Sequence, residues 1–558
     1  MPTLHWIGKD KVINHHRDVP YKVLEKKYTF TAEGTEHTGG APPEESKAER
    51  GGFEHPEAMA GGEGNMIIHG DNLEALKALL PRYEGKVKCI YIDPPYNTGN
   101  EKWVYNDNVN SPMMQEWLGS VVDKEDLTRH DKWLCMMMPR LKLLKELLAE
   151  DGAIFVSIDH NEQHRLRLLM DEVFGEHNFI ADAIWQHSIQ PKGYLGKFSL
   201  HHNYTIAYQK SEIFSLGDIE RTEEHNKNYA NPDNDPNGPW RSGDVRNALH
   251  RPNLIYDIKT PSGKKIKPPE NGWRWSKETV ATKIKSGEIV FSKDEKRIIR
   301  KIYLNTVAGR APETIWFGKD VGTTRDATGE VKDLFGDEVE FFDTPKPTGL
   351  IKRILELCAD EDAIVLDSFA GSGTTAHALL KLNKEDGGNR RFILVEMEDY
   401  ADTITAERVR RVIKGVPKSK NFQEGTGGSF SYFKLGPPIE MEHILHGDRL
   451  PTYEELARYV YYTATGEEFN AEDISGDPKK PFIGTSKHYP GGVYLFYEPD
   501  MGYLMNRAFT LDMARALGKH NNKRRLVFAP MKYLDQDYLD EMRIDYSQLP
   551  FEIYKFKD

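Results

Sequence analysis

Residues 87–96, VKCIYIDPPY, join an apolar run to a turn with two prolines. A short apolar run bounded by a turn is typical of a buried strand. The prolines fix the backbone and remove two N–H donors. The Asp93 carboxylate, free carbonyl oxygens and the Tyr96 ring therefore gather at a strand's carboxyl end, where open α/β sheets bind ligands. A planar ring with an amino group fits there, donating to Asp93 and the Pro94 carbonyl. Alone, these residues fit a rigid loop equally well.

Strands and helices alternate on both sides of this segment. Upstream, residues 66–69 predict a strand, and Asp71 or Asn72 then caps an amphipathic helix. Downstream, residues 140–162 repeat the order of helix, Asp-Gly turn and apolar strand. Residues 342–435 form a second region of the same kind. This alternation predicts a parallel, helix-covered sheet, the doubly wound α/β class.

A second candidate site follows an apolar strand in the later region. Residues 368–375, SFAGSGTT, are small, so a ligand can approach the backbone, and the following helix N-terminus favours polar or anionic groups. The next strand ends in Glu396, a position suited to hydrogen bonding with ribose hydroxyls. A tight turn and a solvated charge are the plainer interpretations of these two features when each is taken alone.

Together the motifs resemble those of DNA amino-methyltransferases. The order DPPY, long insert, FAGSG is similar to the β-class arrangement, and HGD at 69–71 and TPKP at 344–347 fall where that family contacts its cofactor. The strings HWIGKDKVINHHRDVPYKVLE near the start and DPPYNTGNEKWVYND at 93–107 resemble modification subunits of Type III restriction–modification systems.

The resemblance implies a Rossmann-like, S-adenosylmethionine-dependent enzyme that methylates N6 of a flipped adenine in double-stranded DNA, as part of a restriction–modification or related defence system. Asp rather than Ser or Asn at position 93 favours adenine over cytosine, because a carboxylate is the stronger acceptor for the amine. No metal is expected. The implied catalytic residues are Asp93, Pro94, Pro95 and Tyr96. The implied cofactor-binding residues are Asp71, Asp93, Pro345, Lys346, Pro347, Asp367, Phe369, Gly371, Gly373, Thr374 and Glu396.

Composition changes along the chain predict its domains. The net charge is −12, but residues 239–310 hold 17 Lys and Arg against 7 Asp and Glu, a local net of +10 that leaves −22 for the rest. Clustered basic residues can neutralise phosphates. The resemblance implies that a target-recognition domain lies between the two motifs, so a DNA-binding insert is expected there. The predicted domains are an N-terminal segment at 1–30, a flexible linker at 31–64, a methyltransferase domain at 65–210 and 342–435, the insert at 211–341, and a small C-terminal α/β domain at 436–558.

Aromatic and basic side chains alternate in the insert, and aromatic groups can reach base edges or fill the space of a flipped base. A basic solvated surface over a small Trp-containing core is the plainer alternative. The predicted DNA contacts are Arg241, Arg246, Lys264, Lys265, Trp273 and Arg274.

Three alternatives remain open at this stage: a cytosine-N4 methyltransferase of the same fold, a methyltransferase of RNA or of protein glutamine, and a DNA-specificity subunit without turnover. The resemblance implies a homodimer and a possible restriction or helicase subunit as partner. Three scattered cysteines argue against disulfides and a Cys-ligated zinc site, and the lack of an apolar leader or span favours the cytoplasm.

Overall fold

The computed structural model describes residues 3–37, 64–98, 129–191, 198–307, 309–336, 344–438, 450–467, 469–470, 473–474 and 480–549. Most of the predicted linker, 38–63, and the string after Thr98 lie outside these ranges. The chain divides into two compact units, one of residues 1–215 with 313–558 and one of residues 216–312.

An 11-stranded sheet forms the centre of the first unit. Its inner strands β5, β4, β14, β15, β3 and β16 are parallel neighbours, and the pairings β5–β7, β7–β6, β16–β1 and β1–β2 are antiparallel. In spatial order the strands are β13 (Ile315–Trp316), β6 (Phe179–Gln186), β7 (His202–Gln209), β5 (Leu148–Ile158), β4 (Val87–Ile92), β14 (Ile364–Asp367), β15 (Arg391–Glu396), β3 (Met66–His69), β16 (Ser429–Pro438), β1 (Lys22–Thr31) and β2 (Thr35–His37).

The chain reverses its direction of travel across the sheet between β4 and β14. From β4 it proceeds to β5 on one side, and from β14 it proceeds to β15 on the other. Ile90 of β4 is fully buried between Ile154 of β5 and Leu366 of β14. Ligands of open α/β sheets bind at such a switch point, beyond the carboxyl ends of the strands.

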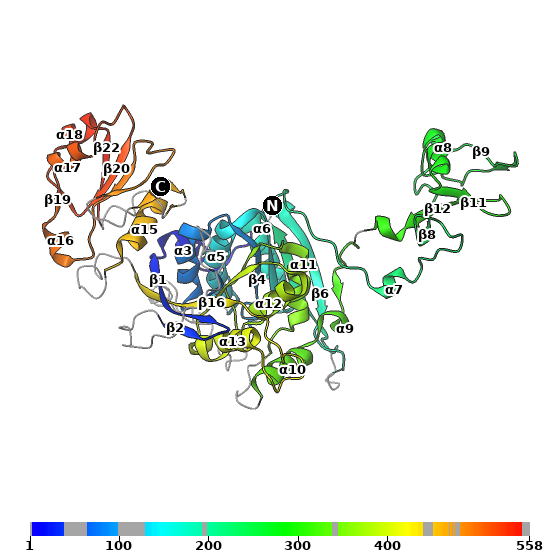
Figure 1. The fold of residues 1–558 in the computed structure, drawn as a ribbon, viewed down its shortest axis with the longest axis horizontal. Coiled ribbons are helices and arrows are strands. Elements are labelled where there is room, and N and C mark those ends of the chain that lie inside the picture. The colour runs from blue at the N-terminus through cyan, green and yellow to red at the C-terminus, as the bar shows by residue number, and fades with distance from the viewer. Residues whose placement is uncertain are drawn as a thin grey trace, which may run out of the picture. The chain divides into compact units, whose positions relative to one another are not determined.

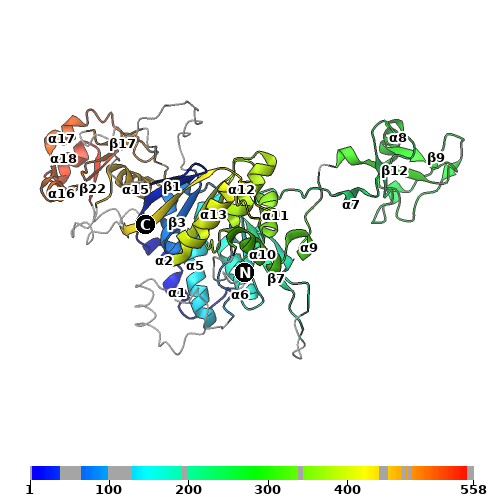
Figure 2. The ribbon, with the colours of Figure 1, turned by 60° about the horizontal axis from the view of Figure 1, so that its bottom comes forward.

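Helices cover both faces of this sheet, as Figures 1 and 2 show. The helices after β3, β4 and β5 pack against one another on one face, and those around β14 and β15 pack on the other. The first group is α3 (Asn72–Tyr83), α5 (Arg129–Leu147) and α6 (Gln163–Phe174), with the short α1 (Lys9–Val12) and α2 (His15–Asp18) against α5. The second group is α9 (Gly318–Val321), α10 (Thr324–Phe335), α11 (Thr348–Cys358), α12 (Thr374–Asp386) and α13 (Glu407–Lys414). The doubly wound α/β prediction is confirmed.

Several predicted boundaries differ from the structure. Residues 211–215, assigned to the insert, belong to the first unit, and β16 of the main sheet extends to Pro438, past the predicted boundary at 435. Residues 35–37, assigned to the linker, form β2, which pairs with β1 at the sheet edge. Residues 313–336, assigned to the insert, belong to the first unit, because β13 pairs in parallel with β6 and is followed by α9 and α10. A two-residue strand carries too little periodicity to be recognised in sequence.

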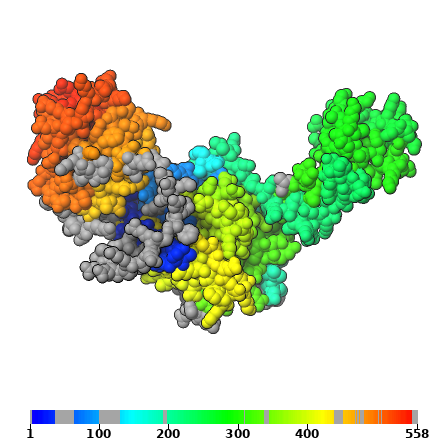
Figure 3. Space-filling view, viewed as in Figure 1, coloured from blue at the N-terminus to red at the C-terminus, as the bar shows by residue number. Residues whose placement is uncertain are grey.

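The second unit, residues 216–312, has its own small core. Its antiparallel sheet is β11 (Ile289–Phe291), β12 (Ile298–Tyr303) and β8 (Trp240–Gly243), accompanied by β9 (Ile258–Lys259), β10 (Lys265–Ile266), α7 (Glu223–Asn226) and α8 (Lys277–Lys285). Trp273 and Ile298 are among the buried apolar residues of this core. Lys301, 5% exposed, pairs with Asp233 and Asp235 and lies 4.9 Å from the Trp240 ring centroid. Green atoms mark this unit in Figure 3.

The described residues after 450 form a small α/β arrangement with its own apolar clusters. A four-stranded sheet has the order β17 (Phe482–Gly484), β18 (Val493–Leu495), β20 (Arg525–Ala529), β22 (Ile544–Gln548), in which β18, β20 and β22 are parallel. The remaining elements are α15 (Tyr453–Thr465), α16 (Met501–Asn506), α17 (Leu511–Ala516), α18 (Gln536–Glu541), β19 (Ala508–Phe509) and β21 (Met531–Lys532).

Within the described ranges, no helix is long and apolar enough to cross a bilayer, and no group of three or more His, Cys, Asp or Glu side chains could hold a metal ion. Cys89, Cys135 and Cys358 are free and buried.

Candidate active site

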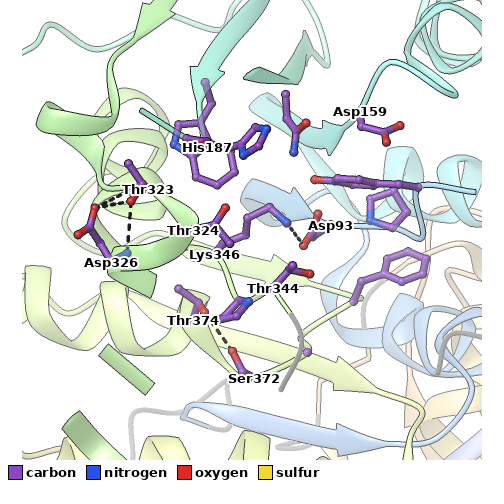
Figure 4. A pocket seen from close by; sticks show the side chains of 18 of the residues that line it. Asp93, Asp159, His187, Thr323, Thr324, Asp326, Thr344, Lys346, Ser372 and Thr374 are labelled. Atoms are coloured by element: carbon purple, nitrogen blue, oxygen red, sulfur yellow. Dashed lines mark hydrogen bonds and ion pairs between the residues drawn. The ribbon is translucent and has the colours of Figure 1, made fainter. Parts of the chain in front are cut away.

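A cavity of about 1120 Å³ opens at the switch point between β4 and β14. Its walls come from segments far apart in sequence: the turn after β4, the loop after β14, the residues before α11, the ends of β6 and β7, and the start of α10. Figure 4 shows these side chains facing one space. The volume exceeds the roughly 300–1,000 Å³ of ordinary small-molecule sites, so it has room for more than one ligand.

The DPPY turn presents one paired and one unpaired carboxylate oxygen. Asp93 Oδ2 forms an ion pair with Lys346 Nζ, which also lies 5.1 Å from the centroid of the Tyr96 ring. Asp93 Oδ1 is buried and has no hydrogen-bond partner among the described residues. Trp133 Nε1 donates to the Pro95 carbonyl at 2.7 Å and fixes the turn. Burial, and then the Asp93 carboxylate, raise the pKa of Tyr96, so its ring is a neutral stacking surface.

A buried carboxylate anchors the residue after this turn. Asn97 has a φ of 53°, in the left-handed region that Asn tolerates better than most residues. Its Nδ2 donates to Glu162 Oε1 at 2.5 Å, and the Glu162 side chain is 0% exposed. Glu162 also contacts His130 Nδ1 at 2.5 Å and Arg165 Nη1 at 3.5 Å. The cluster holds Tyr96 in place through the backbone that follows it.

The Gly-rich loop is fixed by two buried carboxylates. Asp367, 2% exposed, accepts from Thr375 Oγ1 at 2.5 Å and from Phe369 N at 3.1 Å. Glu396, 1% exposed, accepts from Gly371 N at 2.7 Å. Gly373 has a φ of 79°, and a Cβ there would lie 3.0 Å from the Thr405 carbonyl oxygen. Glycine is therefore required at that point of the loop.

Burial raises the pKa of Asp367 to about 7. In the unfolded chain an Asp titrates near about 3.9, so the folded protein holds this proton more tightly. Stability is then lost as pH rises between these two values and is level above the higher one. An Asp367→Asn variant has no such loss. Its unfolding temperature minus that of the unsubstituted protein should therefore increase by at least about 2 °C when the pH is raised from about 5 to about 8. Calorimetry at both pH values measures this difference in unfolding temperature. A difference that does not change with pH would contradict the raised pKa of Asp367.

Asp71 caps helix α3, and the next residue, Asn72, contacts the Gly-rich loop. Its carboxylate accepts from Leu73 N at 2.8 Å and Glu74 N at 3.3 Å. Asn72 Nδ2 donates to the Ser368 carbonyl at 3.1 Å, and the buried Arg140 donates to Asn72 Oδ1 at 2.5 Å. Asn72, the residue directly after the HGD element, thus supports the Gly-rich loop.

The cavity brings together most of the predicted site residues. Ten of them line it: Asp93, Pro94, Pro95, Tyr96, Pro345, Lys346, Asp367, Phe369, Gly371 and Thr374. Asp71, Pro347, Gly373 and Glu396 are not among the lining residues, and the roles of all fourteen residues stay predictions. Sequence reasoning missed other wall residues, because the segments around them lack a recognisable motif: Trp185, His187, His202, Asn203, Thr323, Thr324, Arg325 and Asp326.

The predicted DNA contacts in the second unit divide into two groups. Five of them have exposed side chains: Arg241, Arg246, Lys264, Lys265 and Arg274. Arg246 forms an ion pair with Asp244 at 3.0 Å. Trp273 is only 3% exposed, and its Nε1 donates to the Tyr256 carbonyl at 2.8 Å. Its ring fills the core of the unit, so this residue does not present a surface for DNA.

Residues 87–407 match the N6/N4 methylase family, whose description is DNA methylase. This range is more than half of the chain. The chain belongs to the DNA methylase family.

Among its relatives is the Mod subunit of the Type III restriction-modification enzyme StyLTI from Salmonella typhimurium, 32% identical over 77% of this chain and 68% of the relative. The EcoP15I Mod subunit of Escherichia coli is 31% identical over 60% of this chain and 58% of the relative. The Type II methyltransferase M.KpnI of Klebsiella pneumoniae is 35% identical over 60% and 80%. A solved structure, PvuII DNA methyltransferase (cytosine-N4-specific), gives a TM-score of 0.33 at 14% identity over 62% of this chain and 86% of that one.

This DNA methylase has a cavity that fits the family cofactor, S-adenosylmethionine. Ser368 Oγ, in the Gly-rich loop, is buried without a hydrogen-bond partner among the described residues. Gly371, which has a φ of 52°, lines the cavity and presents backbone there without a side chain. Polar groups and bare backbone of this kind suit a nucleoside with hydroxyl and amine groups. Phe369, Gly371 and Asp367 are the residues best placed to hold it.

Proposed function

We propose that this methyltransferase transfers a methyl group to N6 of an adenine that has been flipped out of double-stranded DNA. The observation that carries the proposal is the buried Asp93 Oδ1, which has no hydrogen-bond partner in the part of the chain that the structure describes and lies in the same cavity as Tyr96 and the Gly-rich loop. An exocyclic amine needs an acceptor and a ring needs a stacking face, and this turn supplies both. When bound, S-adenosylmethionine supplies an electrophilic methyl group on a sulfonium.

Asp93 has two tasks in this scheme. Its Oδ1 accepts one N–H of the adenine amine, which fixes the orientation of the nitrogen, and its charge stabilises the positive charge that develops there. Its Oδ2 stays paired with Lys346, which leaves Oδ1 for the amine. Tyr96 stacks on the base. The base must leave the duplex, because a stacked amine cannot reach a cavity at the sheet edge.

The second unit supports recognition of DNA. Residues 216–312 hold 19 Lys and Arg against 13 Asp and Glu, a net of 19 − 13 = +6. Two of the acidic residues, Asp233 and Asp235, are engaged in ion pairs with the buried Lys301. A basic surface of this kind tracks phosphates, and base contacts then select a sequence.

The relatives named as Mod subunits of Type III enzymes support a place in a restriction–modification system. We accordingly propose a restriction subunit and a second copy of this chain as partners, with the cytoplasm, where the DNA is, as the place of action. Size-exclusion chromatography with light scattering tests the dimer, and a monomer at assay concentration would rule it out. A cytosine-N4 product is the competing outcome, because the family includes both chemistries.

A further inference from the structure

A buried guanidinium lies directly behind the Gly-rich loop. The Arg408 side chain, on α13, is 0% exposed. Its Nη1 donates to Ser372 Oγ at 2.9 Å and to Thr374 Oγ1 at 2.8 Å. Ser372 and Thr374 line the cavity, and Arg408 does not. One buried group therefore holds two wall residues of the cavity by their hydroxyls.

The same guanidinium pairs with a carboxylate that reaches a second wall. Glu330 Oε2, on α10, lies 3.5 Å from Arg408 Nη2. Glu330 also accepts from Thr348 N at 3.1 Å and from Thr348 Oγ1 at 2.7 Å. Thr348 is the first residue of α11 and directly follows Lys346 and Pro347. Glu330 thus satisfies donors at the start of α11, where helix N–H groups lack partners.

The arrangement carries a cost that packing alone does not require. A guanidinium taken out of water loses its hydration, and a buried ion pair seldom recovers that loss in full. Burial lowers the pKa of Arg408 to about 10, and burial together with Arg408 lowers the pKa of His377. His377 is therefore neutral, and its Nδ1, 3.2 Å from Arg408 Nη2, accepts a hydrogen bond. Every group around Arg408 is arranged to keep it charged and fixed.

We infer that Arg408 and Glu330 are a positioning pair that sets the separation between the Gly-rich loop and the Thr344–Pro347 segment, and through it the affinity for S-adenosylmethionine. The inference rests on the proposed cofactor site. The pair touches neither cofactor nor base, so its effect reaches the ligand only through Ser372, Thr374 and the backbone before Thr348. It also connects α10, which lines the cavity at its start, to α13 on the same face of the sheet.

Isothermal titration of S-adenosylmethionine into the full chain tests this inference. Arg408→Gln should raise Kd about tenfold or more, because hydrogen bonds from a charged donor are the strong ones and two wall residues lose theirs. Arg408→Lys keeps the charge but has only one donor group. Its Kd should lie between those of the unsubstituted chain and Arg408→Gln. In steady-state assays KM for S-adenosylmethionine should rise by the same factor, and kcat at saturation should stay within about threefold.

A double-mutant cycle separates positioning from general loosening. Glu330→Gln keeps an acceptor for Thr348 but removes the charge, and should raise Kd about threefold to tenfold. The Kd of the double variant should be only slightly higher than that of the single variant with the larger effect, because the effects of coupled residues are not additive. The matched control is Arg411→Gln: Arg411 is on the same helix, pairs with Glu407 at 2.8 Å and donates to the Leu334 carbonyl of α10 at 2.9 Å. Its Kd should change less than about twofold.

Several results would overturn the inference: an unchanged Kd in folded Arg408→Gln, effects that multiply in the double variant, or an equal rise in the Arg411 control. If Arg408→Gln does not fold, as judged by its thermal transition, Glu330→Gln alone decides, and an unchanged Kd there is a refutation. Failure of the cofactor site looks different, because the unsubstituted chain would then not bind S-adenosylmethionine at all. Failure of the proposed adenine chemistry appears as another methylated nucleoside, with the cofactor affinity of the unsubstituted chain unaffected.

Discussion

Asp93→Asn should lower the rate constant for DNA methylation by about 10³-fold, because one preorganised charge or donor at a reacting atom contributes about 10²–10³ in rate. Asparagine keeps the shape of the side chain but loses the charge that stabilises the positive nitrogen. It also loses the ion pair with Lys346. Single-turnover assays with radiolabelled S-adenosylmethionine measure the chemical step, and titration of the cofactor should show an affinity within about tenfold of the unsubstituted value.

Asp159→Asn is the matched control for this prediction. Asp159 lies in the same cavity and is 8% exposed, but its oxygens accept from Asn161 N at 2.8 Å and Asn161 Nδ2 at 2.7 Å. Its carboxylate is already engaged, so the variant should lose less than about tenfold in rate. Equal losses in the two variants would show that any charge removed from the cavity has this effect, and would take the special role away from Asp93.

Neutralising the exposed basic residues of the second unit should weaken DNA binding by about 10²-fold or more at about 0.1 M salt, and reduce the salt slope by about 0.9 for each phosphate contact removed. The variant changes four exposed side chains to glutamine: Arg241, Lys264, Lys265 and Arg274. Fluorescence anisotropy with a labelled duplex over a series of salt concentrations measures both quantities, and S-adenosylmethionine affinity should not change.

The control variant also removes four positive charges, but from the first unit. It changes four other exposed lysines to glutamine: Lys381, Lys384, Lys418 and Lys420. Its DNA affinity should fall by less than about threefold, since distant charges are screened at this salt concentration. If the two variants weaken DNA binding equally, the second unit is no more than one part of a diffuse electrostatic surface.

Elements with a strong local pattern could be predicted from sequence. The strand at 66–69 has the predicted bounds, and Asp71, one of the two candidates, is the cap of the helix that follows. A short apolar run that ends at Gly-Asp, followed by an amphipathic helix that Asp can cap, is decided by local chemistry. DPPY and FAGSG also had to lie close together once a parallel sheet was assumed, because both follow strands at one edge.

Features that depend on long-range pairing could not be predicted. Nothing near Ile315 shows that β13 joins the main sheet beside β6, and this pairing moved 313–336 out of the predicted insert. The pairing of Lys346 with Asp93 joins residues 253 positions apart, and Arg408 reaches its loop from 34 positions beyond Thr374. Trp273 was expected at the DNA surface, but a small unit needs a large apolar residue for its core.

The central claim is that the Asp93 cavity methylates adenine at N6. The most direct test digests duplex DNA that has been incubated with the full chain and S-adenosylmethionine, and analyses its nucleosides by mass spectrometry. N6-methyladenosine, as the deoxynucleoside, should accumulate with the unsubstituted chain and fall to background with Asp93→Asn. A product of N4-methylcytosine, or N6-methyladenine that persists in Asp93→Asn at the unsubstituted rate, would contradict the account.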